Sequence, residues 1–278
     1  MKTYKYLGRN AAECFLKDQT LRITQPKALN DPFELQPEFI VNDETLLEGM
    51  EFSCKFVLNE NVSSYEKYLI KGNSLAARTK KLDNRKLISR LSEQIGILCL
   101  TRADTLLPVN LLMWAHYAES HQGIVVELKT NCDFIKSGKE VHYVPRRPII
   151  DAKIFLENET VSIDDLYFKS DEWFYENELR LTKILSDCTE TGKKDSLGYY
   201  VYLCGVPIDS IECIYIGCNA SESLKTASLR LHQNVGIKVM YLRAHDEEYK
   251  LVPYASHGLN YPDVFGLSEQ LLYERKKI

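Results

Sequence analysis

Short apolar runs that are typical of buried strands recur along most of this chain, and they constrain its fold more than any other feature. Two of them, "GILCLTR" (96–102) and "GIVVELK" (123–129), are interrupted by few charges. The other strand-like runs are "YKYLG", "TLRIT", "VHYVP", "ELRLTKIL", "YYVYLCGV", "IECIYIG" and "IKVMYLRA". Helices are expected at "AAECFLK", at "LPVNLLMWAHYAESH" with Gly123 ending it, and at "ESLKTASLRLHQN". This order predicts an α+β fold built on a mixed or antiparallel sheet.

Residues 43–96 interrupt the strand-like pattern. Here "LLEGMEFSCKFVL" and "NRKLISRLSEQIG" carry apolar residues at helical spacing. A chain of 278 residues has the length of one large domain or two small ones. We therefore expect a single α+β domain over residues 1–278, with a helical insertion at about 43–96.

The net charge of −4 argues against binding of the whole surface to nucleic acid or to acidic membranes. One segment, residues 71–90, departs from this average. Its charged residues are Lys71, Arg78, Lys80, Lys81, Arg85, Lys86 and Arg90, against Asp83 alone. The segment is either a solvated helix face or a landing site for a phosphate-bearing or protein acceptor, including nucleic acid.

The eight cysteines contain no C-x-x-C pair, so neither zinc nor a disulfide framework is expected. The first residues lack the long apolar run of a secretory signal. No stretch approaches the ~20 apolar residues that span a bilayer. These features predict a cytoplasmic protein with no membrane partner.

The segment "LRITQPKALNDPFE" is the first candidate site. Asn30, Asp31 and Glu34 follow a strand, in a turn that Pro26 and Pro32 stiffen. The segment is either part of a functional site or an Asx-type turn that ends the strand.

The segment "MWAHYAESHQG" is the second candidate site. Met113, Trp114 and Tyr117 form a stripe at helical spacing, which is most often core. His116 lies beside large aromatic residues, as in a ring-stacking pocket. His121 near the helix end has a structural explanation, because the helix dipole favours a cation there.

The segment "EWFYENELR" (172–180) is the third candidate site. If it is a strand, Glu176, Glu178 and Arg180 share one face. The simple interpretation is a surface ladder of ion pairs. Such a ladder does not require the aromatic residues at 173–175, so we expect at least one of the two glutamates to have a functional role.

Three motifs together resemble a bacterial family of domains of unknown function. They are "NDPFE", "MWAHYAESHQG" and "WFYENELR", which match the family's NDPFE, MWAHYxxxHxG and WxYExExR motifs in the same order. The resemblance covers roughly residues 3–250. It departs little from the pattern, with Gln25 and Thr101 at positions where other residues are usual. It implies membership of the family and not a mechanism.

A second resemblance, at the level of the fold, is to the ADP-ribosyltransferases, in which a late strand carries an E-x-E pair. This resemblance implies that Glu178 is the catalytic glutamate and that Glu176 orients the substrate. NAD would be the substrate and no metal would be needed. The "YKYLG" run, with Tyr4 and Tyr6, would line the nicotinamide pocket.

The same resemblance assigns roles to residues of the other motifs. Those expected to stack on the departing ring are Trp114, Tyr117 or Tyr175. Those expected to hold the pyrophosphate are Arg22 or Arg180. Asn30, Asp31 and His116 complete the expected nucleotide pocket. The leading hypothesis is therefore an NAD-consuming ADP-ribosyltransferase-like enzyme, such as a bacterial toxin or phage-defence effector.

Two alternatives remain open at this stage. In "GIVVELK", Glu127 and Lys129 form an E-x-K arrangement, which with Asp31 is similar to the magnesium site of restriction-type nucleases. The nuclease hypothesis requires Asp31 and Glu127 to converge. The other alternative is a recognition pocket for a nucleotide or a protein, without catalysis.

Overall fold

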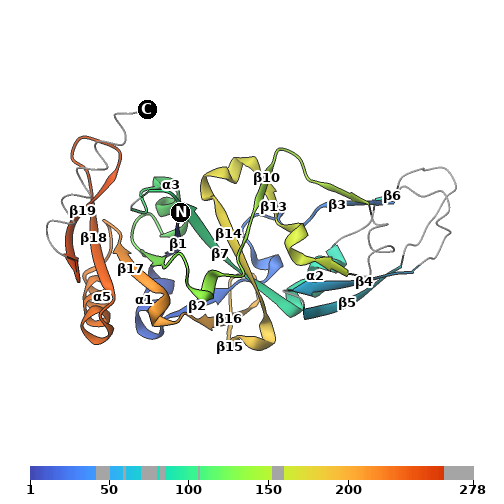
Figure 1. The fold of residues 1–278 in the computed structure, drawn as a ribbon, viewed down its shortest axis with the longest axis horizontal. Helices are drawn as coiled ribbons and strands as arrows, with labels where there is room; N and C mark the ends of the chain where they lie inside the picture. The colour runs from blue at the N-terminus through green and yellow to red at the C-terminus, as the bar shows by residue number, and fades with distance from the viewer. Residues whose placement is uncertain are drawn as a thin grey trace.

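An eight-stranded sheet forms the centre of the protein (Figure 1). The structure, a computed structural model, describes residues 1–41, 51–58, 61–69, 80–81, 85–105, 107–151 and 160–259. In spatial order the strands are β19 (Leu251–His257), β18 (Lys238–Ala244), β17 (Ile211–Ile216), β8 (Ile124–Leu128), β1 (Lys2–Leu7), β7 (Ile95–Ala103), β14 (Glu178–Ile184) and β9 (Lys139–Glu140). Neighbours are antiparallel except β17 and β18, which α5 (Glu222–Val235) connects. The chain is therefore an α+β protein with a mostly antiparallel sheet, as its strand-like runs predict.

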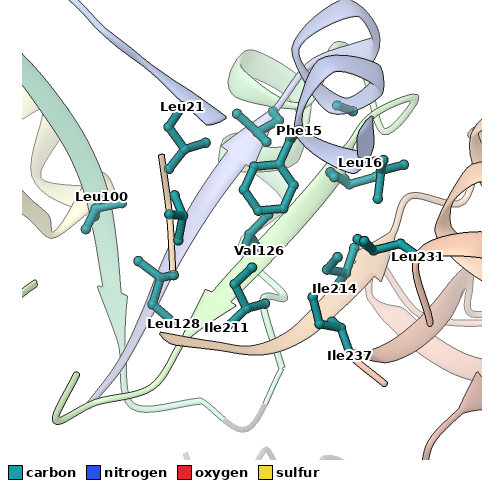
Figure 2. Close-up of a cluster of buried hydrophobic side chains, with 14 of the residues drawn as sticks. Phe15, Leu16, Leu21, Leu100, Val126, Leu128, Ile211, Ile214, Leu231 and Ile237 are labelled. Carbon is teal, nitrogen blue, oxygen red and sulfur yellow. The ribbon is translucent and has the colours of Figure 1, made fainter. Parts of the chain in front are cut away.

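The two faces of this sheet bury different sets of side chains. Helices α1 (Arg9–Asp18) and α5 cover one face, where Phe15 and Leu231 pack with strand residues such as Val126 (Figure 2). Helix α3 (Leu111–Tyr117) lies on the other face, which buries Tyr4, Tyr6, Trp114, Val125 and Tyr215. Successive strand residues alternate between faces, so β8 contributes to both cores.

Helix α3 is shorter than the sequence predicts. The Asn110 side chain caps its first turn by accepting hydrogen bonds from the backbone N–H groups of residues 112 and 113. The helix ends at Tyr117 because residues 119–121 have positive φ angles of 50°, 54° and 67°, which no right-handed helix allows. Gly123 therefore does not end the helix. A Cβ on Gly123 would lie 1.8 Å from the carbonyl oxygen of Leu7, so this glycine permits the close approach of β8 to β1.

Smaller sheets flank the central one. They are β2 (Thr20–Ile23) with β16 (Tyr200–Gly205) and β15 (Thr189–Lys194); β10 (His142–Val144) with β13 (Phe168–Ser170); β3 (Glu38–Val41) with β11 (Ile149–Asp151) and β6 (Lys80–Lys81); and β4 (Glu51–Leu58) with β5 (Asn61–Leu69) and β12 (Thr160–Ser162). The parallel pair β10–β13 places Tyr143 beside Lys169 and Val144 beside Ser170.

The prediction of a helical insertion at 43–96 is wrong for residues 51–58 and 61–69, which form strands. Strands β4 and β5 pair as an antiparallel hairpin, at the end of the molecule far from α5 (Figure 1). The sequence "EFSCKFVL" alternates apolar and polar residues over 52–56, a period of two that favours a strand. The helix expected near "NRKLISRLSEQIG" is present as α2 (Arg85–Gln94). The rest of the insertion lies mostly outside the described residues.

Within the described ranges, no helix has the length and apolarity needed to cross a bilayer.

Candidate functional site

The central sheet opens between β1 and β7. The two strands pair only as far as Tyr4, which lies opposite Thr101, whereas β1 stays paired with β8 through Leu7. Past this point the Lys5 Nζ donates a hydrogen bond of 2.8 Å to the carbonyl oxygen of Cys99 on β7. Lys5 therefore replaces a strand-to-strand hydrogen bond at the place where the strands separate.

A cavity of about 230 Å³ lies at this opening, and we call it the β1–β7 cavity. Segments that are far apart in the sequence contribute to it, because β1, β7, α3 and the loop after β2 all reach its wall. Its polar and aromatic lining residues are Lys5, Tyr6, Thr24, Asn30, Glu34, Thr101, Tyr117, Lys169, Glu176 and Glu178. The cavity thus contains both glutamates of the E-x-E pair.

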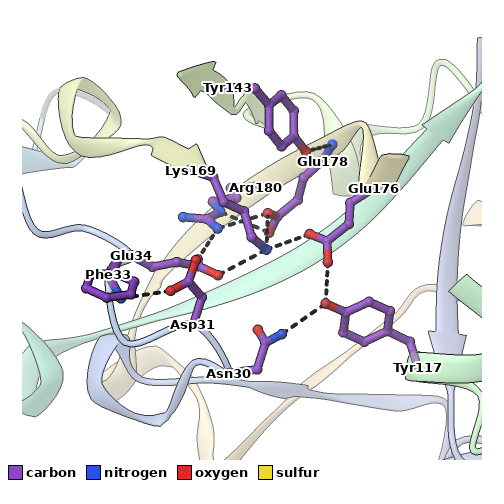
Figure 3. Close-up of polar contacts among 10 residues, drawn as sticks. All are labelled: Asn30, Asp31, Phe33, Glu34, Tyr117, Tyr143, Lys169, Glu176, Glu178 and Arg180. Atoms are coloured by element: carbon purple, nitrogen blue, oxygen red, sulfur yellow. Dashed lines mark hydrogen bonds and ion pairs between the residues drawn. The ribbon is translucent and has the colours of Figure 1, made fainter. Parts of the chain in front are cut away.

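Five charged side chains form one buried ion cluster (Figure 3), and four of them line the cavity while Arg180 lies behind. They are Glu34, Lys169, Glu176, Glu178 and Arg180, each no more than 5% exposed. The Lys169 Nζ lies 2.5 Å from a Glu176 oxygen, 3.0 Å from a Glu34 oxygen and 3.5 Å from a Glu178 oxygen. Isolated buried charges are costly, so this mutual pairing is what allows five of them to be buried together.

Arg180 holds Glu178 from its own strand. The Arg180 Nε and Nη2 donate to the two carboxylate oxygens of Glu178, each at 2.9 Å. Its Nη2 also contacts Glu34, and the Tyr167 ring lies 5.5 Å from the guanidinium carbon. The two-pronged geometry fixes the orientation of the Glu178 carboxylate as well as its charge.

These neighbours shift the protonation equilibria of the cluster. Burial alone would raise the pKa of Glu178, but the charges of Arg180 and Lys169 and the hydrogen bonds from Arg180 lower it to about 2. Burial raises the pKa of Glu34, and the two cations only partly oppose this shift. Burial would lower the pKa of Lys169, yet the surrounding glutamates raise it. At neutral pH, Glu178 and Lys169 are therefore both charged.

A chain of hydroxyl and amide groups links Glu176 to the surface. The Tyr117 hydroxyl donates to a Glu176 oxygen, and the exposed Asn30 donates to the Tyr117 hydroxyl at 3.0 Å (Figure 3). Burial and the hydrogen bond to Glu176 raise the pKa of Tyr117, which keeps the donor protonated. On the other side of the cluster, the Glu178 backbone N–H donates to the Tyr143 hydroxyl at 2.9 Å.

The local backbone explains why Glu176 and Glu178 meet. Glu176 ends a 3₁₀ helix, η4 (Asp171–Glu176), whose first turn is capped by the Ser170 side chain. Asn177 then adopts a left-handed conformation with φ of 42°, after which β14 begins. The predicted strand alternation is correct for Glu178 and Arg180, whereas Glu176 reaches the cluster through a turn. The three side chains are buried, so they do not form a surface ladder.

The aromatic residues of "EWFYENELR" surround the cluster. The Lys169 Nζ lies 4.9 Å from the centre of the Trp173 ring, a cation–π contact. Phe174 packs edge-on against Tyr143 at 5.5 Å. Tyr175 is half-buried, near Trp173 and His116, and does not line the β1–β7 cavity. Trp173 therefore packs on the cluster through Lys169, whereas Phe174 and Tyr175 pack on other rings.

The predicted nucleotide pocket is assembled only in part. Tyr6, Asn30 and Tyr117 line the cavity with the two glutamates. Tyr4 does not, because it is fully buried and its hydroxyl donates to the Thr105 carbonyl.

Trp114 also lies in the core and does not line the cavity. It is fully buried, and its Nε1 donates to the Pro108 carbonyl at 2.5 Å. Its ring stacks on His121 at 5.9 Å and packs edge-on against Tyr6 at 5.7 Å. Trp114 therefore supports Tyr6 from behind and has no free face for a ligand ring.

The remaining predicted residues lie elsewhere. His116 is exposed on α3, beside the rings of Tyr117 and Tyr175. Arg22 on β2 forms an ion pair with Asp195, and Arg180 lies behind Glu178. Neither guanidinium therefore lines the cavity. Asp31 lines a second cavity, described below.

Asp31 and Glu127 do not converge as the nuclease hypothesis requires. Glu127 on β8 accepts from the Tyr215 hydroxyl at 2.5 Å and pairs with Lys2 at 2.8 Å. Asp31 accepts from the backbone N–H of Phe33, and within the described part of the chain no contact joins it to Glu127. The described residues also contain no group of three or more His, Cys, Asp or Glu side chains arranged around one metal position.

Sequence reasoning missed two cations of the site. Lys169 is the central one, and it lies on the short strand β13, seven residues before Glu176. Lys5 lies between two tyrosines of β1, and burial lowers its pKa. The only available signal was physical, since three acids that become buried together require cations nearby. The basic segment 71–90, in contrast, lies largely outside the described residues.

Comparisons with known proteins do not identify the chain: no family model, no curated protein and no solved structure matches it.

Proposed function

We propose that the protein is an ADP-ribosyltransferase-like enzyme that cleaves the bond between nicotinamide and ribose in NAD. The observation that supports this proposal is that Glu176 and Glu178 line one cavity together with Tyr6 and Tyr117. This placement combines carboxylates, which stabilise a cation, with aromatic rings that can contact a cationic pyridinium ring.

The proposed reaction begins with heterolysis of the bond from the ribose C1′ to the nicotinamide nitrogen. Nicotinamide leaves with the electron pair, and the ribose carries positive charge as in glycoside cleavage. An acceptor oxygen or nitrogen then forms the new bond to C1′ and loses its proton. The acceptor is water, a small molecule, a protein or a nucleic acid.

Glu178 is the proposed catalytic carboxylate. Its lowered pKa keeps it ionised at any physiological pH, so a negative charge is present when the ribose becomes cationic. Its orientation by Arg180 removes the need to reorganise during the reaction.

Glu176 has the proposed role of orienting the substrate. One of its oxygens accepts from Tyr117 and the other faces Lys169, so its carboxylate is held in a fixed direction. A ribose hydroxyl that donates to Glu176 would be positioned by the same network.

The test is incubation of the purified protein with NAD labelled on the adenosine half and, separately, on nicotinamide. We expect nicotinamide release that falls about 100- to 1000-fold in Glu178→Gln, the typical effect of losing one stabilising group. Glu127→Gln is the matched control, because Glu127 is equally buried on the same sheet and does not line the cavity.

Two outcomes would contradict the proposal. One is no nicotinamide release from any acceptor mixture by a folded protein that binds NAD. The other is equal loss of release in Glu178→Gln and Glu127→Gln, which would indicate general destabilisation.

A binding function without turnover is the second candidate, and one observation favours it. Both oxygens of Glu178 are already bonded to cations, and both oxygens of Glu176 to Tyr117 and Lys169. A pocket of this kind would bind NAD with an affinity that Glu178→Gln leaves unchanged. A titration of the native chain and of Glu178→Gln with NAD, beside the release assay, therefore separates the two candidates.

A further inference from the structure

A second cavity, also of about 230 Å³, adjoins the buried ion cluster, because Lys169 of the cluster lines it. We call it the Arg146 cavity. Lys169 lines both cavities, so one side chain separates them. The volume exceeds the ~150 Å³ that accommodates a benzene ring, so a planar ring system has room to enter.

Part of the wall of the Arg146 cavity is apolar. Phe33 lies on the wall and remains 63% exposed, while Phe168 on β13 is half-buried. The other apolar lining residues are Pro37, Val144, Pro145, Pro148 and Leu166. An aromatic ring that stays exposed beside a cavity is a surface that a stacked ligand ring would cover.

Two arginines lie at one side of this cavity, where the chain leaves β10 as Pro145-Arg146-Arg147-Pro148. The prolines at each end restrict the backbone that presents them. The Arg147 Nε donates to the Gln36 carbonyl at 2.6 Å. Arg146 is exposed and has no ion-pair partner among the described residues. This geometry provides positive charge for an anionic group.

A carboxylate also lines the Arg146 cavity. Asp31 is only 7% exposed, and one of its oxygens accepts from the Phe33 backbone N–H at 2.9 Å (Figure 3). Its second oxygen has no partner within the described ranges. This oxygen is not among the fully buried polar atoms that lack a partner, so water reaches it at the cavity, and a ligand N–H group can replace that water.

We propose that the Arg146 cavity binds a nucleoside monophosphate whose purine base carries an amino group. The base stacks against Phe33, and its amino group donates to Asp31. The phosphate lies against Arg146 and Arg147. The proposal stands independently of NAD cleavage, since it rests on residues outside the E-x-E pair.

The test is calorimetric titration of the full chain with AMP and with three comparison ligands. Adenosine lacks the phosphate, inorganic phosphate lacks the base, and purine riboside monophosphate lacks only the amino group. We expect AMP to bind at least tenfold more tightly than each of the three.

Two variants locate the bound AMP. Asp31→Asn should weaken AMP binding about tenfold and leave the affinity for purine riboside monophosphate unchanged, because that ligand lacks the amino donor. Arg146→Ala should weaken both nucleotides and reduce their dependence on salt. Glu127→Gln serves as the control, because Glu127 lines neither cavity, and it should leave AMP binding unchanged.

The proposal would be overturned if AMP does not bind at millimolar concentration, or if Asp31→Asn and Arg146→Ala bind it like the native chain. AMP affinity lost in Glu176→Gln and retained in Asp31→Asn would move the site to the β1–β7 cavity. AMP binding in a chain that does not cleave NAD would leave this proposal standing while the proposed function fails.

Discussion

Glu178 and Glu127 lie in one row on the same face of the central sheet, yet their surroundings differ. Strand pairing places Glu178 opposite Thr101, Thr101 opposite Tyr4, and Tyr4 opposite Glu127. Three strand spacings of about 4.8 Å separate the two acids by roughly 14 Å. Each is 4% exposed.

The partners of the two acids make the difference. Glu127 is held by the Tyr215 hydroxyl and by Lys2, whose side chain is 33% exposed, and it lines none of the cavities described above. Glu178 is held by two fully desolvated cations and lines the β1–β7 cavity. Burial alone therefore does not distinguish the two acids; they differ because Glu178 lines a cavity and pairs with two buried cations.

The largest expected contrast is in stability. Arg180→Met leaves Glu34, Glu176 and Glu178 with Lys169 alone, so we expect a loss of about 3–5 kcal/mol in the free energy of unfolding. Lys2→Met should cost about 1 kcal/mol, because Lys2 is partly exposed and solvent already screens its charge. Urea denaturation measures both. Equal losses in the two variants would remove the distinction between the two sites.

The cations around Glu178 should also make the stability depend on pH. The depressed pKa of Glu178 stabilises the folded state above its unfolded value of about 4.3, and this stabilisation is lost as the pH falls towards 2. A shift of about two units corresponds to a contribution on the order of 3 kcal/mol. The raised pKa of Glu34 acts in the opposite direction, because it stabilises the folded state as the pH falls towards the unfolded value of about 4.3, so it offsets part of the loss expected from Glu178.

The measurement is the free energy of unfolding at pH 5 and at pH 3, for the native chain and for Glu178→Gln. The drop between the two pH values should be smaller in Glu178→Gln than in the native chain. A parallel drop in both proteins would show that other carboxylates account for the acid sensitivity.

Removing the hydroxyl that donates to a buried acid at each site should give a smaller difference in stability. Tyr215→Phe leaves a Glu127 oxygen in the core without its donor, which costs about 1–3 kcal/mol. Tyr117→Phe removes the donor to Glu176 beside a cavity that water can enter, so a loss of about 1 kcal/mol or less is expected. Thermal denaturation measures both, and a larger loss in Tyr117→Phe would contradict the comparison.

The smallest expected effect concerns Lys5, at the opening between the two acids. Burial lowers its pKa, so its amine should become neutral and reactive at a lower pH than an ordinary lysine. Competitive acetylation across a pH series, read by mass spectrometry, should show Lys5 titrating below the surface lysines. Full occupation of the β1–β7 cavity by a ligand should slow this labelling. Titration together with the surface lysines would show that Lys5 is solvated.

Much of the fold could be predicted from the sequence, because its signals are local. The nine strand-like runs predicted from apolar patterning are strands over most of their lengths, and Ser221 and Gly236 bound α5 as capping rules predict. The error at 43–96 arose because "EFSCKFVL" fits helical spacing and strand alternation over a short length.

The candidate site was predictable only in part. The sequence motif identified the acidic residues, but it did not identify the lysine that pairs with them. Spacing on β14 indicates that Glu178 and Arg180 share a face, and the structure places them there. Nothing in the spacing indicates that Lys169 lies between three glutamates, or that Trp114 turns its ring into the core.

The sequence by itself determined where the strands lie, which side chains share a face of each strand, and which acids the strands carry. These features follow from periodicity along a few neighbouring residues. Only the tertiary structure decided which acid meets a cavity. That outcome depends on β1 leaving β7 after Tyr4 and on a lysine from a distant strand, Lys169, reaching the gap. Such contacts are set by the packing of segments about a hundred residues apart, for which the sequence has no local signal.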